Sequence, residues 1–442
     1  MKAQHWLVMF VVMGVLVPLA TVAQGDLLAE ELEAGSSAAQ PVGGPVVISS
    51  LPEDQREPAV AYNEQLQEYL VVWWNDRPGN DDIYAQRVGQ EGQPVGPWFS
   101  ISAGQGVERR RPDVAWNSRR NEYLVVWYHD DWIHARRVPA VGGVLGSEIT
   151  VDQGTQELSN YPRVAYAYTS DKYVVVWQSW TTDGQVILTS SVAARTLTTD
   201  GNLEGPVFLV SQDTVGNARF GPRVAYNRSR NEHLVVWQQF DIYTGKSRIF
   251  ARRLLGSGGL MFPESIPIST AQGDHIFPDV AGMPTSPHEG FYLVTWEDQT
   301  GASQVRAQRL NGEGYLQGPS FLVGTRDGSE ASVASVAANK RSDAYLVAWA
   351  TTTWSPYLWR DLRVRSVSLG GALVGAEEVI SGNFADYPAV ASGPQEDFLV
   401  VYQDTAQTGT QHDIYGQLWG SREAPVGPGY DVYLPVVKRS SP

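Results

Sequence analysis

The chain has 442 residues, of which 43% are hydrophobic and 11% aromatic, and it contains no Cys. This composition indicates a packed globular protein and excludes disordered chains, disulfide scaffolds, thiolate metal sites and cysteine nucleophiles. The net charge of −15 disfavours binding to phosphate backbones, so we expect no nucleic acid partner.

The N-terminus has the pattern of a secretory signal peptide over residues 1–23. Lys2 supplies one positive charge, and an apolar run from Trp6 to Ala20 precedes small residues at the expected cleavage site. The run is shorter than the roughly 20 residues that a spanning helix needs, which disfavours a membrane anchor. We therefore expect a secreted or cell-surface protein with no membrane insertion after signal cleavage. Residues 24–45 are rich in Ala, Gly, Ser and Glu, which predicts a flexible leader.

Four short phrases recur in a fixed order through the rest of the chain. The first is Pro-x-Val-Ala, which begins at Pro58, Pro112, Pro162, Pro222, Pro278 and Pro388 and has a weaker copy from Ser335. The second is Tyr-Leu-Val-Val-Trp, which ends at Trp73, Trp127, Trp177, Trp237, Trp296, Trp349 and Tyr402. A third phrase, Ile-Tyr-Ala-Gln-Arg-Val in the first unit, and a fourth that ends near Ile-Ser complete each unit. Their Val, Ile, Tyr and Trp content between Asn, Gly, Asp and Pro predicts four strands in each of seven units.

The second phrase is apolar at consecutive positions, so both faces of its strand must be buried. Small sheets arranged around an axis bury both faces, because each sheet has a neighbour on either side. We therefore predict an all-β fold, a seven-bladed β-propeller of four-stranded antiparallel blades over residues 46–419. Residues 420–442 would form a C-terminal tail.

Two segments compete to close this ring. Val46–Ser49 matches the fourth phrase and precedes the first unit, so it can pair beside Ile414–Trp419 as the outer strand of the last blade. Residues 430–437 compete for the same place. We predict that the N-terminal strand closes the ring, because it carries the Ile-Ser ending that the tail lacks.

The repeats resemble a group of secreted bacterial β-propeller proteins built from P-x-V-A-Y-N, Y-L-V-V-W and D-I-Y-x-Q-R-V phrases. The resemblance covers residues 46–419, nearly all of the chain after the signal peptide. It implies the propeller fold and carries no implication for function, because a fold alone licenses no activity.

Residue types that recur in most units are explained by the blade itself. We assign the repeated Trp residues to the core and the recurring Arg87, Arg137, Arg253 and Arg309 to pairing or capping within blades. Acidic residues cluster at the hairpin between the second and third phrases, where turn chemistry explains them and Ca²⁺ binding is the alternative. They are Asp76, Asp81, Asp82, Asp130, Asp131, Glu297, Asp298, Asp404 and Asp413.

The segment from His129 to His134 is the best metal candidate in the sequence. His134, however, takes the place that Tyr84, Phe250 and Tyr415 hold in other units, so it is interpreted as the local aromatic residue. We therefore assign no metal ligand and no cofactor, with Ca²⁺ kept as the alternative.

The candidate binding residues lie just before the first phrase, where the chain enters the innermost strand at the mouth of the expected funnel. They are Arg110, Arg111, Tyr161, Phe220, His275, Phe277, Asp386 and Tyr387. Arg beside aromatic residues at a concave mouth suits a sugar, a carboxylate or a peptide loop. The alternative is that aromatic residues before proline only seal the tops of the blades. Blade-specific extensions, with Trp354 and Trp359 among them, could rim the same face.

No catalytic motif is present: the sequence lacks a Gly-x-Ser-x-Gly elbow, a phosphate-binding glycine loop and a dinucleotide fingerprint. We expect a secreted monomer that binds a glycan or a protein at the funnel face without catalysis. One alternative is a polysaccharide-acting enzyme, a glycoside hydrolase or lyase, that uses carboxylates such as Asp386 and Glu57. Another is a purely structural module of the cell surface.

Overall fold

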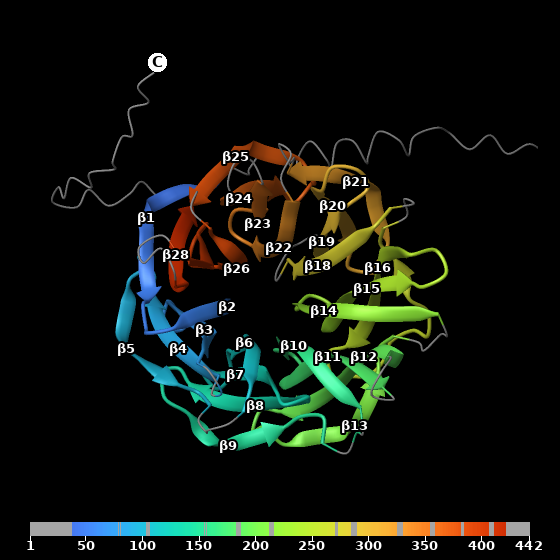
Figure 1. The fold of residues 1–442 in the computed structure, drawn as a ribbon, viewed down its shortest axis with the longest axis horizontal. Helices are drawn as coiled ribbons and strands as arrows, with labels where there is room; N and C mark the ends of the chain where they lie inside the picture. The colour runs from blue at the N-terminus through green and yellow to red at the C-terminus, as the bar shows by residue number, and fades with distance from the viewer. Residues whose placement is uncertain are drawn as a thin grey trace, which may run out of the picture.

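The computed structural model describes residues 38–420, except for 78, 80, 103–106, 154, 156, 183–186, 212–215, 270–272, 284–289, 325–329, 354–358, 382–383 and 406–410. The predicted signal peptide, most of the leader, the tail from residue 421 and Trp354 lie outside these residues, as does the side chain of Trp359. The described residues form 28 strands in seven four-stranded antiparallel sheets. The sheets surround a central axis (Figure 1), which confirms the predicted seven-bladed β-propeller. None of these residues belongs to a helix long and apolar enough to span a bilayer.

The strands of each blade follow one another from the axis to the rim (Figure 1). Blade 1 has β2 (Asp54–Asn63), β3 (Glu68–Asp76), β4 (Asp82–Gly89) and β5 (Pro94–Ser100), and blade 2 has β6 (Arg109–Asn117), β7 (Glu122–His129), β8 (Trp132–Pro139) and β9 (Leu145–Thr150). Blade 3 has β10 (Leu158–Ala167), β11 (Lys172–Thr182), β12 (Ile187–Thr198) and β13 (Leu203–Leu209), and blade 4 has β14 (Asn217–Asn227), β15 (Glu232–Asp241), β16 (Lys246–Leu255) and β17 (Ile266–Pro267). Blade 5 has β18 (His275–Gly282), β19 (Phe291–Asp298), β20 (Gln304–Asn311) and β21 (Leu316–Gly324), and blade 6 has β22 (Glu330–Asn339), β23 (Ala344–Thr353), β24 (Trp359–Ser368) and β25 (Leu373–Ser381). Blade 7 has β26 (Asp386–Ser392), β27 (Phe398–Asp404), β28 (Asp413–Gly420) and, as its outer strand, β1 (Gln40–Ser49).

The second strand of each blade is buried on both faces, as its consecutive apolar residues predict. In β3 every residue from Tyr69 to Asn75 is buried, and the apolar clusters combine side chains of neighbouring blades. Trp127 of blade 2, for example, packs with Leu70 and Val72 of blade 1. The repeated Trp residues are at most 1% exposed, which confirms their assignment to the core.

The recurring arginines join each blade to the next. Arg87, Arg137 and Arg253 each pair with a Glu on the second strand of their own blade and donate to a backbone carbonyl in the outer turn of the next blade. The pairs are Arg87–Glu68, Arg137–Glu122 and Arg253–Glu232, with N–O distances of 2.7, 2.8 and 2.6 Å, and the carbonyl acceptors belong to Val141, Asp200 and Glu313. Arg309 instead covers the Phe291 ring of its own blade and donates to the carbonyl of Gly370 in the outer turn of the next blade. These residues are structural, as predicted, and they act across the seam as well as within the blade.

The N-terminal strand closes the ring, as predicted. Within β1, Val46 lies opposite Gly416 and Val47 opposite Tyr415 of β28. The strand begins at Gln40 rather than at Val46, so residues 40–45 belong to the propeller and not to the leader. Gly-Gly-Pro at 43–45 is typical of a turn, but here it forms a bulge, with Gly43 at a φ of +73°, between two paired stretches.

Candidate functional site

A bulge in the innermost strand precedes the Pro-x-Val-Ala phrase of every blade. The pairing register between the first and second strands shifts there in all seven blades, as between Arg110 and Asp113 in blade 2. In six blades the residue before proline has a positive φ: Glu57 (48°), Arg111 (56°), Tyr161 (52°), Gly221 (53°), Phe277 (50°) and Tyr387 (50°). The left-handed conformation costs a non-glycine residue about 1–2 kcal/mol, so the surrounding contacts must hold it.

Side-chain oxygens hold this conformation by accepting the exposed backbone N–H groups. The N–H of Glu57 donates to Gln403 Oε1 of blade 7 at 2.9 Å. The N–H of Tyr387 donates to Asp386 Oδ1 at 2.8 Å, and that of Tyr161 donates to the side chain of the residue before it at 2.7 Å. Such bulges redirect side chains, and here they bring the residue before proline to the central cavity.

The central cavity has a volume of about 700 Å³, and the innermost strand of every blade contributes to its wall. Tyr161, Phe220, Phe277 and Tyr387 give it aromatic faces, and Phe277 and Tyr387 are 48% and 38% exposed. We call this cavity the funnel. Its volume lies in the range of pockets that bind small molecules or short oligomers.

Charged side chains share the mouth of the funnel with these aromatic faces. The Arg111 guanidinium lies 3.9 Å from the centre of the Tyr161 ring and donates to Asn160 Oδ1 at 2.6 Å. Its Nε is 3.9 Å from the carboxylate of Glu57. Burial, together with the nearby charges of Glu57 and Asp386, raises the pKa of Tyr387 to about 12. At neutral pH this phenol therefore keeps its proton and can donate a hydrogen bond to a ligand.

The pre-proline residues form one ring of side chains around the funnel. The residues that follow the proline position in each blade form a second ring beside it. Blades 2 to 5 contribute Asp113, Arg163, Arg223 and Asp279 to it, and the remaining blades contribute Ala59, Ser335 and Ala389. Arg223 Nε is 3.6 Å from Asp279 Oδ1. One half of this ring is therefore charged, with two cations and two anions, and the other half is small and neutral.

The two aspartates of this ring also link blades. Asp113 Oδ2 accepts the backbone N–H of Val164 at 2.8 Å, and Asp279 Oδ2 accepts that of Val336 at 2.9 Å, each on the next blade. Burial raises the pKa of both carboxyls, although the neighbouring arginines oppose this shift. Burial and the nearby Arg163 lower the pKa of Arg223 to about 10, which still leaves it charged at neutral pH.

Comparison with known proteins supports the fold and no specific function. No family model matches the sequence, and no curated protein matches it. A protein of unknown function from Dyadobacter fermentans has a similar structure, with a TM-score of 0.51, 12% identity, and coverage of 87% of this chain and 99% of the other. The polysaccharide lyase Uly1 has a TM-score of 0.50 and 6% identity, over 86% of this chain and all of its own. The microbial sialidase Hz136 has a TM-score of 0.47 and 11% identity, over 83% of this chain and 65% of its own. The likenesses to the Dyadobacter fermentans protein and to Uly1 establish the fold alone.

Five of the eight residues proposed from the sequence line the funnel. They are Arg111, Tyr161, Phe220, Phe277 and Tyr387. All are the residue before proline except Phe220, which is one position earlier, beside Gly221. The sequence therefore identifies the aromatic wall of the funnel correctly in position, while its role in binding stays a prediction.

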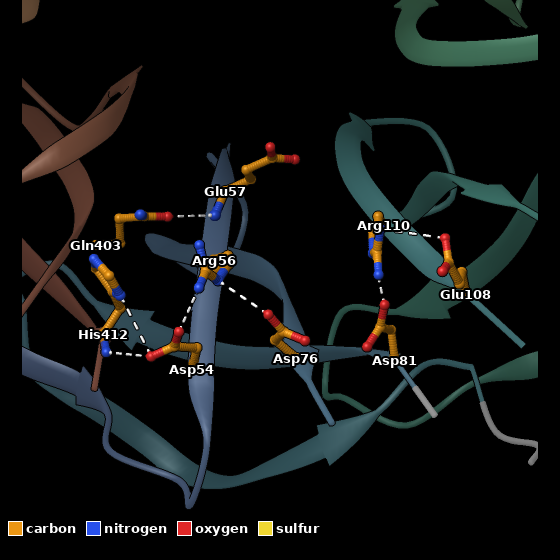
Figure 2. Close-up of polar contacts among 9 residues, drawn as sticks. All are labelled: Asp54, Arg56, Glu57, Asp76, Asp81, Glu108, Arg110, Gln403 and His412. Atoms are coloured by element: carbon orange, nitrogen blue, oxygen red, sulfur yellow. Dashed lines mark hydrogen bonds and ion pairs between the residues drawn. The ribbon is translucent and has the colours of Figure 1, made fainter. Parts of the chain in front are cut away.

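The other three lie outside the funnel wall. Arg110 Nε contacts Asp81 Oδ2 at 2.6 Å and its guanidinium covers the Trp74 ring, so it ties blade 2 to blade 1 (Figure 2). Figure 2 also shows the Glu57 carboxylate pointing away from this network. His275 is 1% exposed, and burial lowers its pKa. Asp386 is 5% exposed, pairs with Arg360 and accepts the N–H of Tyr387, so it positions the funnel wall instead of facing a ligand.

The second ring was missed, although the repeats carry a signal for it. Its members occupy the variable position of Pro-x-Val-Ala, which reads Ala, Asp, Arg, Arg, Asp and Ala in the six complete copies. A position that varies in charge inside an otherwise constant phrase is specific to its blade. Residue types that recur in most blades are explained by the scaffold, whereas this blade-specific charge is not.

Several acidic hairpin residues form ion pairs within a blade or with the next blade. Asp76 lies 3.4 Å from Arg56 of its own blade, and Asp82 lies 3.1 Å from Arg109 of the next blade (Figure 2 shows the Arg56 pair). Asp130 and Asp131 have φ values of 45° and 69°, which are turn conformations that aspartate tolerates. These contacts support the turn and scaffold interpretation of the acidic cluster.

Proposed function

We propose that this chain is a secreted, non-catalytic binding protein that holds a glycan in its funnel. The observation that carries the proposal is the repeated bulge: one backbone conformation presents Glu57, Arg111, Tyr161, Phe277 and Tyr387, four residue types from five of the seven blades, to one cavity. A purely structural role gives no reason for this variation, because the scaffold residues repeat from blade to blade.

The chemistry of the wall suits a sugar. Aromatic rings stack on the apolar faces of sugar rings, and Tyr161, Phe277 and Tyr387 offer such faces around the mouth. Arg111 adds a charge-assisted donor, and the ring below it adds both cations and carboxylates that bind hydroxyl groups. A funnel of about 700 Å³ holds a short oligosaccharide more readily than a protein surface.

Two observations favour binding over catalysis. The enzymatic alternative needs Asp386 and Glu57 to face each other, but Asp386 is buried and is engaged by Arg360 and by the N–H of Tyr387. Asp113 and Asp279, the carboxylates deeper in the funnel, each accept a backbone N–H of the next blade, which accounts for their presence.

A glycan array followed by calorimetry tests the proposal. We expect a saturable glycan ligand whose affinity falls at least about 30-fold in the double variant Arg111→Ala/Tyr387→Ala, since one charge-assisted hydrogen bond and one aromatic contact together contribute about 2–4 kcal/mol. Tyr315→Ala is the matched control, because Tyr315 is 66% exposed on an outer turn. Unchanged affinity in the double variant would refute the funnel as the site.

The same preparation separates the alternatives. Release of new reducing ends or unsaturated sugars from polysaccharides would overturn the non-catalytic part of the proposal, and loss of that release in Asp113→Asn would place the chemistry in the funnel. Capture of a protein ligand that competes with no glycan would overturn the glycan assignment. Export is tested by N-terminal sequencing of the protein from the medium, which we expect to begin at Gln24.

A further inference from the structure

Two histidines and a glutamate meet in blade 2, away from the residues of the funnel wall. His129 ends β7, His134 lies on β8 and Glu148 lies on the outer strand β9. His134 Nδ1 is 3.5 Å and His129 Nδ1 is 4.0 Å from Glu148 Oε2. One ligand atom from each residue lies within 4.8 Å of the others, and the three side chains are only 16–23% exposed.

The same three backbone positions are filled differently in other blades. They hold Asn75, Tyr84 and Trp98 in blade 1 and Thr351, Arg363 and Glu377 in blade 6. Tyr84 packs edge-on against Trp98, whereas Arg363 forms an ion pair with Glu377 at 3.2 Å. Blades therefore close this position by aromatic packing or by an ion pair. The propeller fold does not require two imidazoles and a carboxylate there.

The aromatic interpretation of His134 explains only part of this arrangement. Its ring lies 6.1 Å from Trp127, as Tyr84 lies 6.3 Å from Trp73, so it does fill the expected place. The Nδ1 atoms of His129 and His134, however, are both fully shielded from solvent without a hydrogen-bond partner. Both nitrogens face the same carboxylate oxygen, Glu148 Oε2, at 4.0 and 3.5 Å, which is long for a hydrogen bond, so this single oxygen satisfies the two imidazoles poorly.

We propose that His129, His134 and Glu148 bind one divalent transition-metal ion, with zinc as the preferred ion and a fourth coordination position left open. Two imidazole nitrogens and one carboxylate oxygen match the ligands of zinc, whereas Ca²⁺ and Mg²⁺ prefer oxygen ligands only. Ligand atoms about 2.0–2.2 Å from a tetrahedral ion lie roughly 3.3 Å apart. The three ligand atoms lie within 4.8 Å of one another, so side-chain rotations that draw them together would complete the site.

The neighbouring charges are compatible with a cation. Arg109, which lies opposite His129 in the sheet, is the nearby positive group, and its guanidinium is paired with Asp82 at 3.1 Å. Asp130, the next residue after His129, adds a negative charge. The pairing of Arg109 with His129 also places the site on the same face of the propeller as Arg111, further from the axis. A metal there joins the outer strand β9 to the β7–β8 hairpin.

Titration of the metal-free chain without a histidine tag tests the proposal. We expect one Zn²⁺ per chain with a submicromolar Kd, and a visible absorption band of tetrahedral type when Co²⁺ replaces zinc. His134→Phe introduces the residue that blade 4 has at this position, so it should fold normally and bind zinc at least about 100-fold more weakly. Glu148→Gln should also weaken binding, and His412→Gln, which removes a histidine at another seam, is the control expected to have no effect.

Three results would overturn the proposal. They are the absence of saturable zinc binding to the wild-type chain, equal zinc affinity of wild type and His134→Phe, and Ca²⁺ binding at the same residues with an affinity equal to that of zinc. If His134→Phe loses the near-ultraviolet circular dichroism of the folded protein, Glu148→Gln decides in its place.

Discussion

Removal of the N-terminal strand tests the closure of the ring. A chain that begins at residue 51 lacks β1, so blade 7 keeps three strands and β28 becomes an open edge. Val42 and Ile48 of β1 are 6% and 4% exposed, and burial of each contributes about 1.5–3 kcal/mol. The loss is therefore about 3–6 kcal/mol before any backbone hydrogen bond is counted. For a propeller of this size, the loss of this free energy lowers Tm by about 4–8 °C, because the unfolding entropy is about 2.1 cal/mol/K per residue.

The assay compares chains that begin at residues 38 and 51 by thermal unfolding followed with near-ultraviolet circular dichroism. We expect the lower Tm in the shorter chain, together with concentration-dependent association through the open edge of β28. A peptide of residues 38–50, added in trans, should restore the Tm. The same peptide with Ile48→Asp should fail, because residue 48 packs into the buried cluster of blade 7 beside Leu399.

Equal Tm values for the two chains would refute this reasoning. Rescue by the Ile48→Asp peptide would refute it as well, since closure would then not depend on the buried face of β1.

Two variants and one effect of pH follow from the packing and the buried charges. Trp237→Ala should destabilise the protein by about 3–5 kcal/mol in urea unfolding, because Trp237 is 1% exposed between two blades. Arg253→Met should cost about 1.5–3 kcal/mol in the same assay, because the buried Glu232 loses its hydrogen bonds from Arg253 and keeps the longer contact with Arg230 at 3.5 Å. Burial lowers the pKa of His233 to about 4, below the value of about 6.5 in the unfolded chain, so the unfolded state takes up a proton first as the pH falls. Stability is then fully present above about pH 6.5, and about 3 kcal/mol is lost as the pH falls to about 4.

Matched controls separate these effects from general damage. Trp98→Ala removes a tryptophan that is 45% exposed and should cost far less than Trp237→Ala. Arg120→Met breaks an exposed ion pair with Asp200 and should cost less than about 1 kcal/mol. His233→Tyr introduces the residue that most blades have at this position and should lose about 3 kcal/mol less than wild type between pH 6.5 and 4. A cost for Arg120→Met equal to that of Arg253→Met, or identical pH profiles for wild type and His233→Tyr, would contradict the corresponding explanation.

The architecture could be predicted from the sequence because the same apolar run, buried on both faces, occurs in every unit. Seven copies of an apolar run with both faces buried leave few folds, and the Ile-Ser ending placed Val46–Ser49 in the last blade. The start of β1 at Gln40 was not accessible, since Gly-Gly-Pro at 43–45 has the composition of a turn and its bulge depends on pairing with β28.

Side-chain direction at the funnel limited the prediction of the site. A slip of one residue in a strand turns every side chain to the opposite face, and the bulge introduces such a slip before each proline. Arg111 therefore faces the funnel whereas Arg110, its neighbour, ties two blades together. Tyr387 and Asp386 differ in the same way. Glu148 lies beside the two histidines because of the pairing register between the outer strand β9 and β8. The spacing of these residues in the sequence does not reveal that register.

The repeated bulge makes the proposed recognition surface separable from the fold. Proline follows the bulged position in six blades, and side-chain acceptors hold the backbone N–H of Glu57, Tyr161, Phe277 and Tyr387, so the side chain there is not what fixes the blade. Glu57, Arg111, Tyr161, Gly221, Phe277 and Tyr387 are points of variation around one cavity, of which Arg111 contacts both Tyr161 and Glu57. Under the proposed function, single substitutions at these points would change which ligand the funnel prefers while the seven-bladed body stays the same.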